Sequence, residues 1–168
     1  MGDETKNLVD VINLNDSVLD YTKYIQVGMK AIDGNQVVNG KIPLTGTEVG
    51  ATITLQNNTA GMVALHNSNA INNNTLKIIA RNGTLGMIAS DKSLVRNNGN
   101  IDIAFQGTTA TDQVDGMYAD TSSTAINDGK ITGNAAVDSV AGTLIGMQGR
   151  LINQVQNPAG TIPTQLIN

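Results

Sequence analysis

Short runs of alternating apolar and polar residues recur along this chain, and no helical spacing of apolar residues persists over residues 26–165. In the tetrapeptide Gly-Met-x-Ala, the methionine and the alanine point to one face of an extended strand, and the residue between them points to the other. The run Ala51–Leu55 alternates in the same way. The pattern therefore predicts short β-strands.

The dipeptide Gly-Met recurs at positions 28, 61, 86, 116 and 146. The residue two places after each methionine is always small, being Ala31, Ala64, Ala89, Ala119 or Gly149. A second block with the outline Ile/Val-Asn-x-Gly-x-Ile follows about ten residues after each glycine, and a variable third piece completes the unit. Such a period, between 20 and 50 residues, indicates a stack of repeated units.

A period near 30 residues with three blocks predicts an all-β parallel β-helix (β-solenoid) with three short strands per turn and about five to six turns. Its hand should be right, because parallel crossovers are right-handed. Asn-Gly steps also favour hairpins, but hairpins do not repeat the same residues once per turn. The five methionines should form one inward column, and Val38, Ile71, Val95 and Ile126 a second. Corner asparagines should bond to the asparagine one turn above, and the third piece should absorb the differences in length.

The repeats divide the chain into three parts. Residues 28–150 are the solenoid, and residues 151–168 are a degenerate final turn whose worn second block is Val155–Ile162. Residues 1–27 are an N-terminal cap or a degenerate turn. A short helix over residues 16–25, with Asp16 as its N-cap, is one alternative, and a strand-containing turn is the other.

Charge and composition exclude several classes of function. A net charge of −4 and a pI near 4.7 argue against nucleic acid as a partner. The absence of cysteine excludes a disulfide framework, a cysteine zinc site and a thiol nucleophile. The chain starts without an apolar leader and has neither a polybasic run nor an apolar stretch of membrane-spanning length. We therefore expect a soluble fragment that makes no membrane contact, with a monomer favoured.

Candidate chemistry is sparse. His66 is the single histidine, and we expect it in a solvated turn. Asp112, Asp115, Asp120 and Asp128 form the densest acidic patch, and a glycosidase would need two of them about 5–10 Å apart. Weak calcium binding there is a lesser alternative. We expect no catalytic residue, no metal site and no cofactor. Outward residues that could contact a partner are Lys30, Arg81, Phe105 and Tyr118.

The sharpest repeat copy, Gly116-Met117-Tyr118-Ala119 followed by residues 124–131 (Thr-Ala-Ile-Asn-Asp-Gly-Lys-Ile), resembles the repeats of very large type V autotransporter adhesins of Gram-negative bacteria. The resemblance covers about residues 26–165. It implies a right-handed β-helical passenger that projects from the outer membrane at the bacterial cell surface and binds host or bacterial partners, either proteins or glycans. It supplies no individual binding residue.

Three functions remain open at this point. The first is an adhesin passenger fragment, a rigid solenoid that presents loops for binding and has no enzymatic activity. The second is a phage or secreted β-helix that binds or cleaves a polysaccharide, although only four aromatic residues are present to stack on sugars. The third is a scaffold without a ligand. A glycan-cleavage assay on variants of Asp112, Asp115 and Asp120 separates the first two.

Overall fold

Parallel strands account for nearly all the regular structure. The computed structural model describes residues 11–13, 17–19, 26–40, 52–135, 141–150 and 165–167. Sheet A contains β1 (Val11–Asn13), β4 (Gln36–Asn39), β7 (Asn69–Asn72), β10 (Leu94–Asn97), β13 (Thr124–Asn127) and β16 (Gln165–Ile167). Sheet B contains β2 (Ser17–Leu19), β5 (Thr52–Leu55), β8 (Thr75–Ala80), β11 (Asn100–Phe105) and β14 (Lys130–Ala135). Sheet C contains β3 (Gln26–Ile32), β6 (Thr59–Leu65), β9 (Thr84–Ser90), β12 (Gln113–Asp120) and β15 (Thr143–Arg150).

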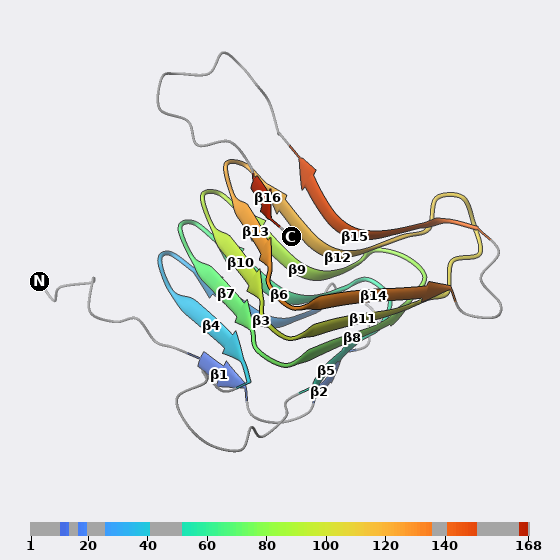
Figure 1. Ribbon diagram of the computed structural model, residues 1–168, viewed down its shortest axis with the longest axis horizontal. Coiled ribbons are helices and arrows are strands. Elements are labelled where there is room, and N and C mark those ends of the chain that lie inside the picture. Colours follow the sequence, from blue (N-terminus) through green and yellow to red (C-terminus); the bar gives the residue numbers. More distant parts are fainter. Residues whose placement is uncertain are drawn as a thin grey trace, which may run out of the picture.

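Each strand pairs in parallel with the equivalent strand of the next turn, for example β9 with β12 and β12 with β15. Figure 1 shows the turns stacked as successive coils around a shared interior. The chain is therefore a parallel β-helix with three strands per turn, as the repeat period predicts. It has about four to five turns, slightly fewer than expected. The right hand of the coil stays a prediction.

The repeated residues of sheet C form the interior columns that the sequence predicts. The methionines pair in the order Met29, Met62, Met87, Met117 and Met147. The small residues of the same strands stack in the same order. The side chains of Met62, Met87 and Met117 are fully buried. Thioether side chains adapt their shape, so they fill a narrow core against Leu and Ile from sheet B.

The predicted inward column of sheet A is correct at Val95 but wrong at Val38, Ile71 and Ile126. Val95 pairs with Ala70 and Ala125 and faces the core. Val38, Ile71 and Ile126 instead pair in register with Arg96, in the neighbouring column outside the core cluster. Val37 joins Ala70, Val95 and Ala125 in the core. The buried asparagine that ends each strand sets this register, and side chains alternate along a strand, so the core residue must lie two places before the asparagine.

An asparagine ladder runs along the corner between sheets A and B, as predicted. Asn39 Nδ2 donates to Asn72 Oδ1 at 2.8 Å, and Asn72 Nδ2 donates to Asn97 Oδ1 at 2.7 Å. Asn97 Nδ2 donates to Asn127 Oδ1 at 2.8 Å. Asn39, Asn72 and Asn97 are fully buried. A second ladder joins Asn98 Nδ2 to Asn73 Oδ1 at 2.7 Å at the surface.

The corners explain the unequal repeat lengths. The third and fourth units carry their extra residues between sheets B and C, at 106–112 and 136–142, as predicted. In the first unit the extra residues, 40–51, lie between β4 and β5, so the predicted place is wrong there. Consequently Ile53, not Ile42, is the partner of Leu76. The corners that follow β3, β6, β9 and β12, between sheets C and A, each have three residues, of which the first two have positive φ, as at Asp91 and Lys92.

Both ends contribute strands to the stack. Strand β1 pairs with β4 and β2 pairs with β5, so residues 11–13 and 17–19 form the degenerate turn and not the alternative helix. The rest of residues 1–25 lies outside the described residues. The place beside β13 is taken by β16, whereas the worn block Val155–Ile162, which was expected to continue the repeat, lies outside the described residues.

Candidate functional site

A bend in sheet C shapes the outer surface. At the Gly-Met steps of Gly61, Gly86 and Gly116, the glycine and the methionine both face the interior, which breaks the alternation of the strand. A Cβ on Gly61 would lie 2.5 Å from the carbonyl oxygen of Gly86 and 3.0 Å from Leu55 Cδ1, so only glycine fits there. The strands bend inward at this step, and Figure 1 shows the bend clearly in β12 and β15. The outer face of sheet C is therefore concave.

Two outward columns line this concave face. Val27, Ala60, Leu85, Asp115 and Ile145 form the first, and Lys30, Val63, Ile88, Tyr118 and Gln148 form the second. Outward side chains near the bend are well covered, and Val63 is only 7% exposed. Asp115 is the single carboxylate in an otherwise apolar column. The face repeats its geometry from turn to turn but not its chemistry.

A hollow of about 170 Å³ lies beside Asp115 on this face. It is lined by Asn82, Gly83, Thr84, Leu85, Gln113 and Asp115. The Asp115 carboxylate is only 3% exposed. Gln113 Nε2 donates to its two oxygens at 3.0 and 3.1 Å, and to Gln148 Oε1 at 3.2 Å. Burial raises the pKa of Asp115, and the bond from Gln113 opposes that shift.

The other carboxylates of the acidic patch do not join Asp115. Asp112 Oδ2 accepts hydrogen bonds from the backbone N–H groups of Thr108 and Thr109 at 2.7 and 2.9 Å, and these bonds lower its pKa. Asp112 therefore closes the loop 106–112. Asp128 is exposed at another corner, 3.4 Å from Arg96 Nε. Asp120 lies five residues beyond Asp115, at the far end of β12 and past the bend, and no neighbouring carboxylate contributes to the raised pKa of Asp115.

Three of the four predicted contact residues are accessible. Lys30 is exposed and Tyr118 half-buried, in one column of the concave face. Arg81 is exposed at the corner that precedes β9, next to Asn82. Whether these three residues contact a partner stays a prediction.

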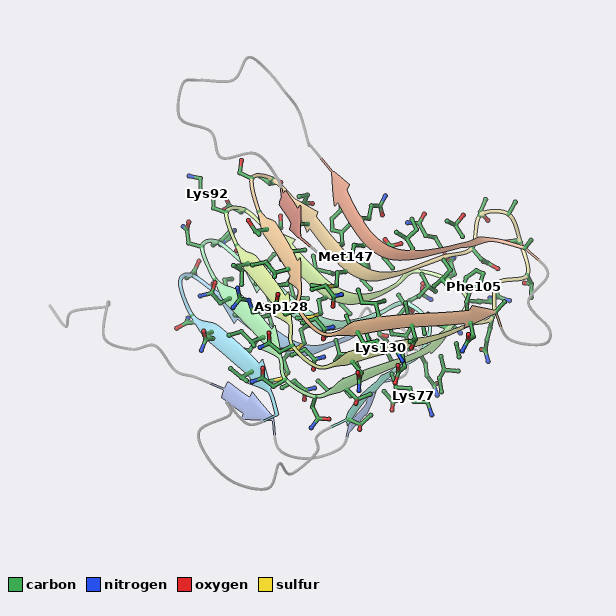
Figure 2. The ribbon with its side chains drawn as sticks, viewed as in Figure 1. Lys77, Lys92, Phe105, Asp128, Lys130 and Met147 are labelled. Atoms are coloured by element: carbon green, nitrogen blue, oxygen red, sulfur yellow. The ribbon has the colours of Figure 1, made fainter. Side chains whose placement is uncertain are left out.

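Phe105 is not a surface residue, so that prediction is wrong. It is only 5% exposed, because alternation along β11 turns Ile101, Ile103 and Phe105 into the core. Glycines 107 and 142 lie close against its ring, where a Cβ would collide with Phe105 Cζ. Figure 2 shows Phe105 at the corner between sheets B and C.

His66 lies in an exposed corner, as predicted, and has a positive φ of 53°. The sequence does not reveal its neighbours from adjacent turns: His66 Nδ1 is 3.0 Å from Asp33 Oδ1, and Nε2 is 3.7 Å from Asp91 Oδ2. Within the described ranges, no group of three or more His, Asp or Glu side chains is placed to hold a metal ion. In the same ranges, no helix could span a lipid bilayer.

Comparison with known proteins gives a family. The family described as BigA third pectate lyase-like domain matches residues 1–130, which is most of the chain. No curated protein and no solved structure matches it significantly. The family description does not mention autotransporters, so the resemblance of the repeats to those of autotransporter adhesins stays a proposal. With three parallel sheets coiled into a β-helix over the matched residues, this chain belongs to the family of BigA third pectate lyase-like domains.

Proposed function

We propose that this chain is a non-enzymatic binding module of a bacterial surface protein, which adheres to host or bacterial partners through the concave face of sheet C. The observation that carries the proposal is the contrast between the two sides of that sheet. The inward columns repeat Met and Ala, whereas the outward column changes through Lys30, Val63, Ile88, Tyr118 and Gln148. Core packing explains why the inward residues are the same in every turn. Recognition of a partner would explain why the outward residues differ from turn to turn.

Apolar side chains on the same face support a binding role. Val27 and Ile32 are 38% and 37% exposed, at the edge of a face that also carries Ile88 and Tyr118. Apolar and aromatic side chains of this kind supply binding energy when a partner covers them. The proposed location is the outer membrane at the cell surface, which follows from the likeness of the repeats to those of autotransporter adhesins.

A retention assay tests the proposal. The chain is immobilised, and the retention of epithelial cells and of Gram-negative bacteria is measured. A variant with Lys30→Ala, Ile88→Ser and Tyr118→Ala should lose retention. The matched control is Lys77→Ala, an exposed change on β8 of sheet B. Equal retention by both variants, or none by the unchanged chain, would contradict the proposal. Circular dichroism and thermal unfolding verify that each variant is folded.

The runner-up function is cleavage of a polysaccharide. The buried Asp115 carboxyl favours it, because a raised pKa suits a general acid. However, Asp112 is bonded within its own loop. No neighbouring carboxylate contributes to the raised pKa of Asp115, so no partner for a two-carboxylate mechanism is apparent among the described residues. Incubation with polysaccharides, followed by a reducing-sugar assay on the unchanged chain and on Asp115→Asn, separates the two functions. Turnover that is lost in the variant would establish the enzyme.

A further inference from the structure

The hollow beside Asp115 interrupts the outer surface at one turn. The equivalent positions in neighbouring turns are Leu85 and Ile145. A carboxylate in place of an aliphatic side chain loses hydration on burial and gains no packing. Asp102 on sheet B is an outward aspartate of the more usual kind. Its Oδ1 accepts a hydrogen bond from the Thr132 hydroxyl on the next turn at 2.5 Å. The position of Asp115 therefore calls for an explanation beyond folding.

The polar atoms around the hollow are only partly used. Each oxygen of Asp115 accepts one bond, from Gln113 Nε2, and a carboxylate oxygen can accept two. Asn82 Oδ1 accepts from the Gln113 backbone N–H at 3.4 Å, which leaves its amide Nδ2 available. Acceptors and donors thus face the same small space, and Leu85 supplies an apolar wall.

The charges around the hollow select against ionic ligands. Asp115 repels an anion, and within the described residues no group of three or more His, Asp or Glu side chains is placed to hold a metal ion. A neutral ligand whose hydroxyl groups both donate and accept satisfies the free carboxylate lone pairs and the Asn82 amide together. The neighbouring Ile88 and Tyr118 of the second outward column offer an apolar surface to the C–H faces of a sugar ring.

We infer that the hollow lined by Asn82, Gln113 and Asp115 binds a neutral saccharide unit, with Asp115 accepting hydrogen bonds from its hydroxyl groups. This inference rests on the proposed function and names the ligand class of the same face. A hollow of about 170 Å³ has room for a single ring, so the remainder of a glycan would extend along the concave face. Affinity would then come from several such shallow contacts.

A glycan array with neutral and uronic-acid oligosaccharides tests the inference, and the strongest neutral oligosaccharide is then titrated by calorimetry. Asp115→Asn should weaken its binding by about tenfold or more, because a hydrogen bond to a charged acceptor is replaced by one to a neutral amide. Asp115→Leu, which copies the residue of the preceding turn, should abolish binding while the chain stays folded. The matched control is Asp128→Asn, at an exposed corner, with unchanged affinity.

The outcomes separate this inference from the function on which it rests. Preference for uronic-acid glycans, or equal binding by the unchanged chain and Asp115→Leu, would overturn it. If no glycan binds but cells are still retained through the concave face, the inference fails and the adhesive function stands. If neither glycans nor cells are retained, both fail.

Discussion

At the scale of single residues, buried polar groups contribute specificity that the thin apolar core cannot. Asn72 lies in the middle of the asparagine ladder, where its Oδ1 accepts from Asn39 and its Nδ2 donates to Asn97. It also bonds to its own corner, because Nδ2 donates to the Asn74 carbonyl oxygen at 2.9 Å. A slip in register by one residue between turns would break the bonds to Asn39 and Asn97, so the ladder fixes how the turns stack.

Asn72→Ala should lower the free energy of unfolding by about 2–4 kcal/mol, since each buried polar group that loses its partner costs about 1–3 kcal/mol. Asn98→Ala removes a similar bond at the surface, where water replaces the partner, and should cost less than about 1 kcal/mol. Urea unfolding of the two variants gives the comparison. Equal losses of unfolding free energy would mean that the buried asparagine ladder stabilises the fold no more than the exposed Asn98–Asn73 bond does.

Two aspartates should give opposite pH dependences. Asp115 has a raised pKa in the folded chain, so its ionisation disfavours folding, and stability falls as pH rises from the ordinary aspartate pKa of 3.8 through the raised pKa. Asp112 has a lowered pKa, so it stabilises the fold at neutral pH, and that contribution is lost as pH falls below about 3.8. The sign of each effect follows from which state binds the proton more tightly.

Urea unfolding from neutral to acid pH, with Asp115→Asn and Asp112→Asn, measures these contributions. Asp115→Asn should be more stable than the unchanged chain at neutral pH, and Asp112→Asn less stable. Both differences should shrink on acidification. If the two variants shift stability in the same direction at neutral pH, the assignment of the two environments is wrong.

At the scale of elements, the Gly-Met step bends the strands of sheet C and so makes the outer face concave. The reason for glycine is close stacking: a Cβ on Gly86 would collide with the carbonyl oxygen of Gly116 and lie 3.2 Å from Ile78 Cδ1. At Gly146, in the last strand of the sheet, the nearest atom to such a Cβ is Ile131 Cγ2 at 3.9 Å. The glycine of the Gly-Met dipeptide is therefore required for close packing at position 86 but not at position 146.

Gly86→Ala should destabilise the chain by about 1–3 kcal/mol, because the added methyl group forces the stacked backbones apart. Gly146→Ala has space and should change stability by no more than about 0.5 kcal/mol. Thermal and urea unfolding of the two variants check this. Comparable destabilisation at both positions would show that glycine is needed for its backbone conformation and not for the close approach of the stacked strands.

Sequence reasoning reached the strands, the parallel stacking and the methionine column, because identical residues at one-turn spacing constrain their own register. The prediction failed where the direction of a single side chain had to be assigned. Val38, Ile71 and Ile126 were placed inward by their apolar character, whereas the asparagine that follows them sets the register and turns Val37, Ala70 and Ala125 inward. Phe105 was placed outside as a contact residue, although alternation from Ile101 turns it inward. The hollow beside Asp115 depends on the bend of sheet C, which no spacing in the sequence reports.

At the scale of the whole molecule, stability is the sum of contacts between adjacent turns, so the chain behaves as a stack of coupled units. The interior is apolar and continuous from Met29 to Met117, with Ile131, Leu144 and Met147 only partly buried against it. Figure 2 shows Met147 on β15, at one end of the methionine column. The concave face is built by the same stacking, so the proposed binding surface exists only if the turns align.

The most direct test of this account is the order of the methionines in the folded chain. With 13C-labelled methionine methyl groups, NMR should detect through-space contacts from Met29 to Met62, Met62 to Met87, Met87 to Met117 and Met117 to Met147, since stacked strands lie about 4.7–4.9 Å apart. Contacts between methionines of non-adjacent turns, or none at all, would contradict the stacked register and remove the concave face with it.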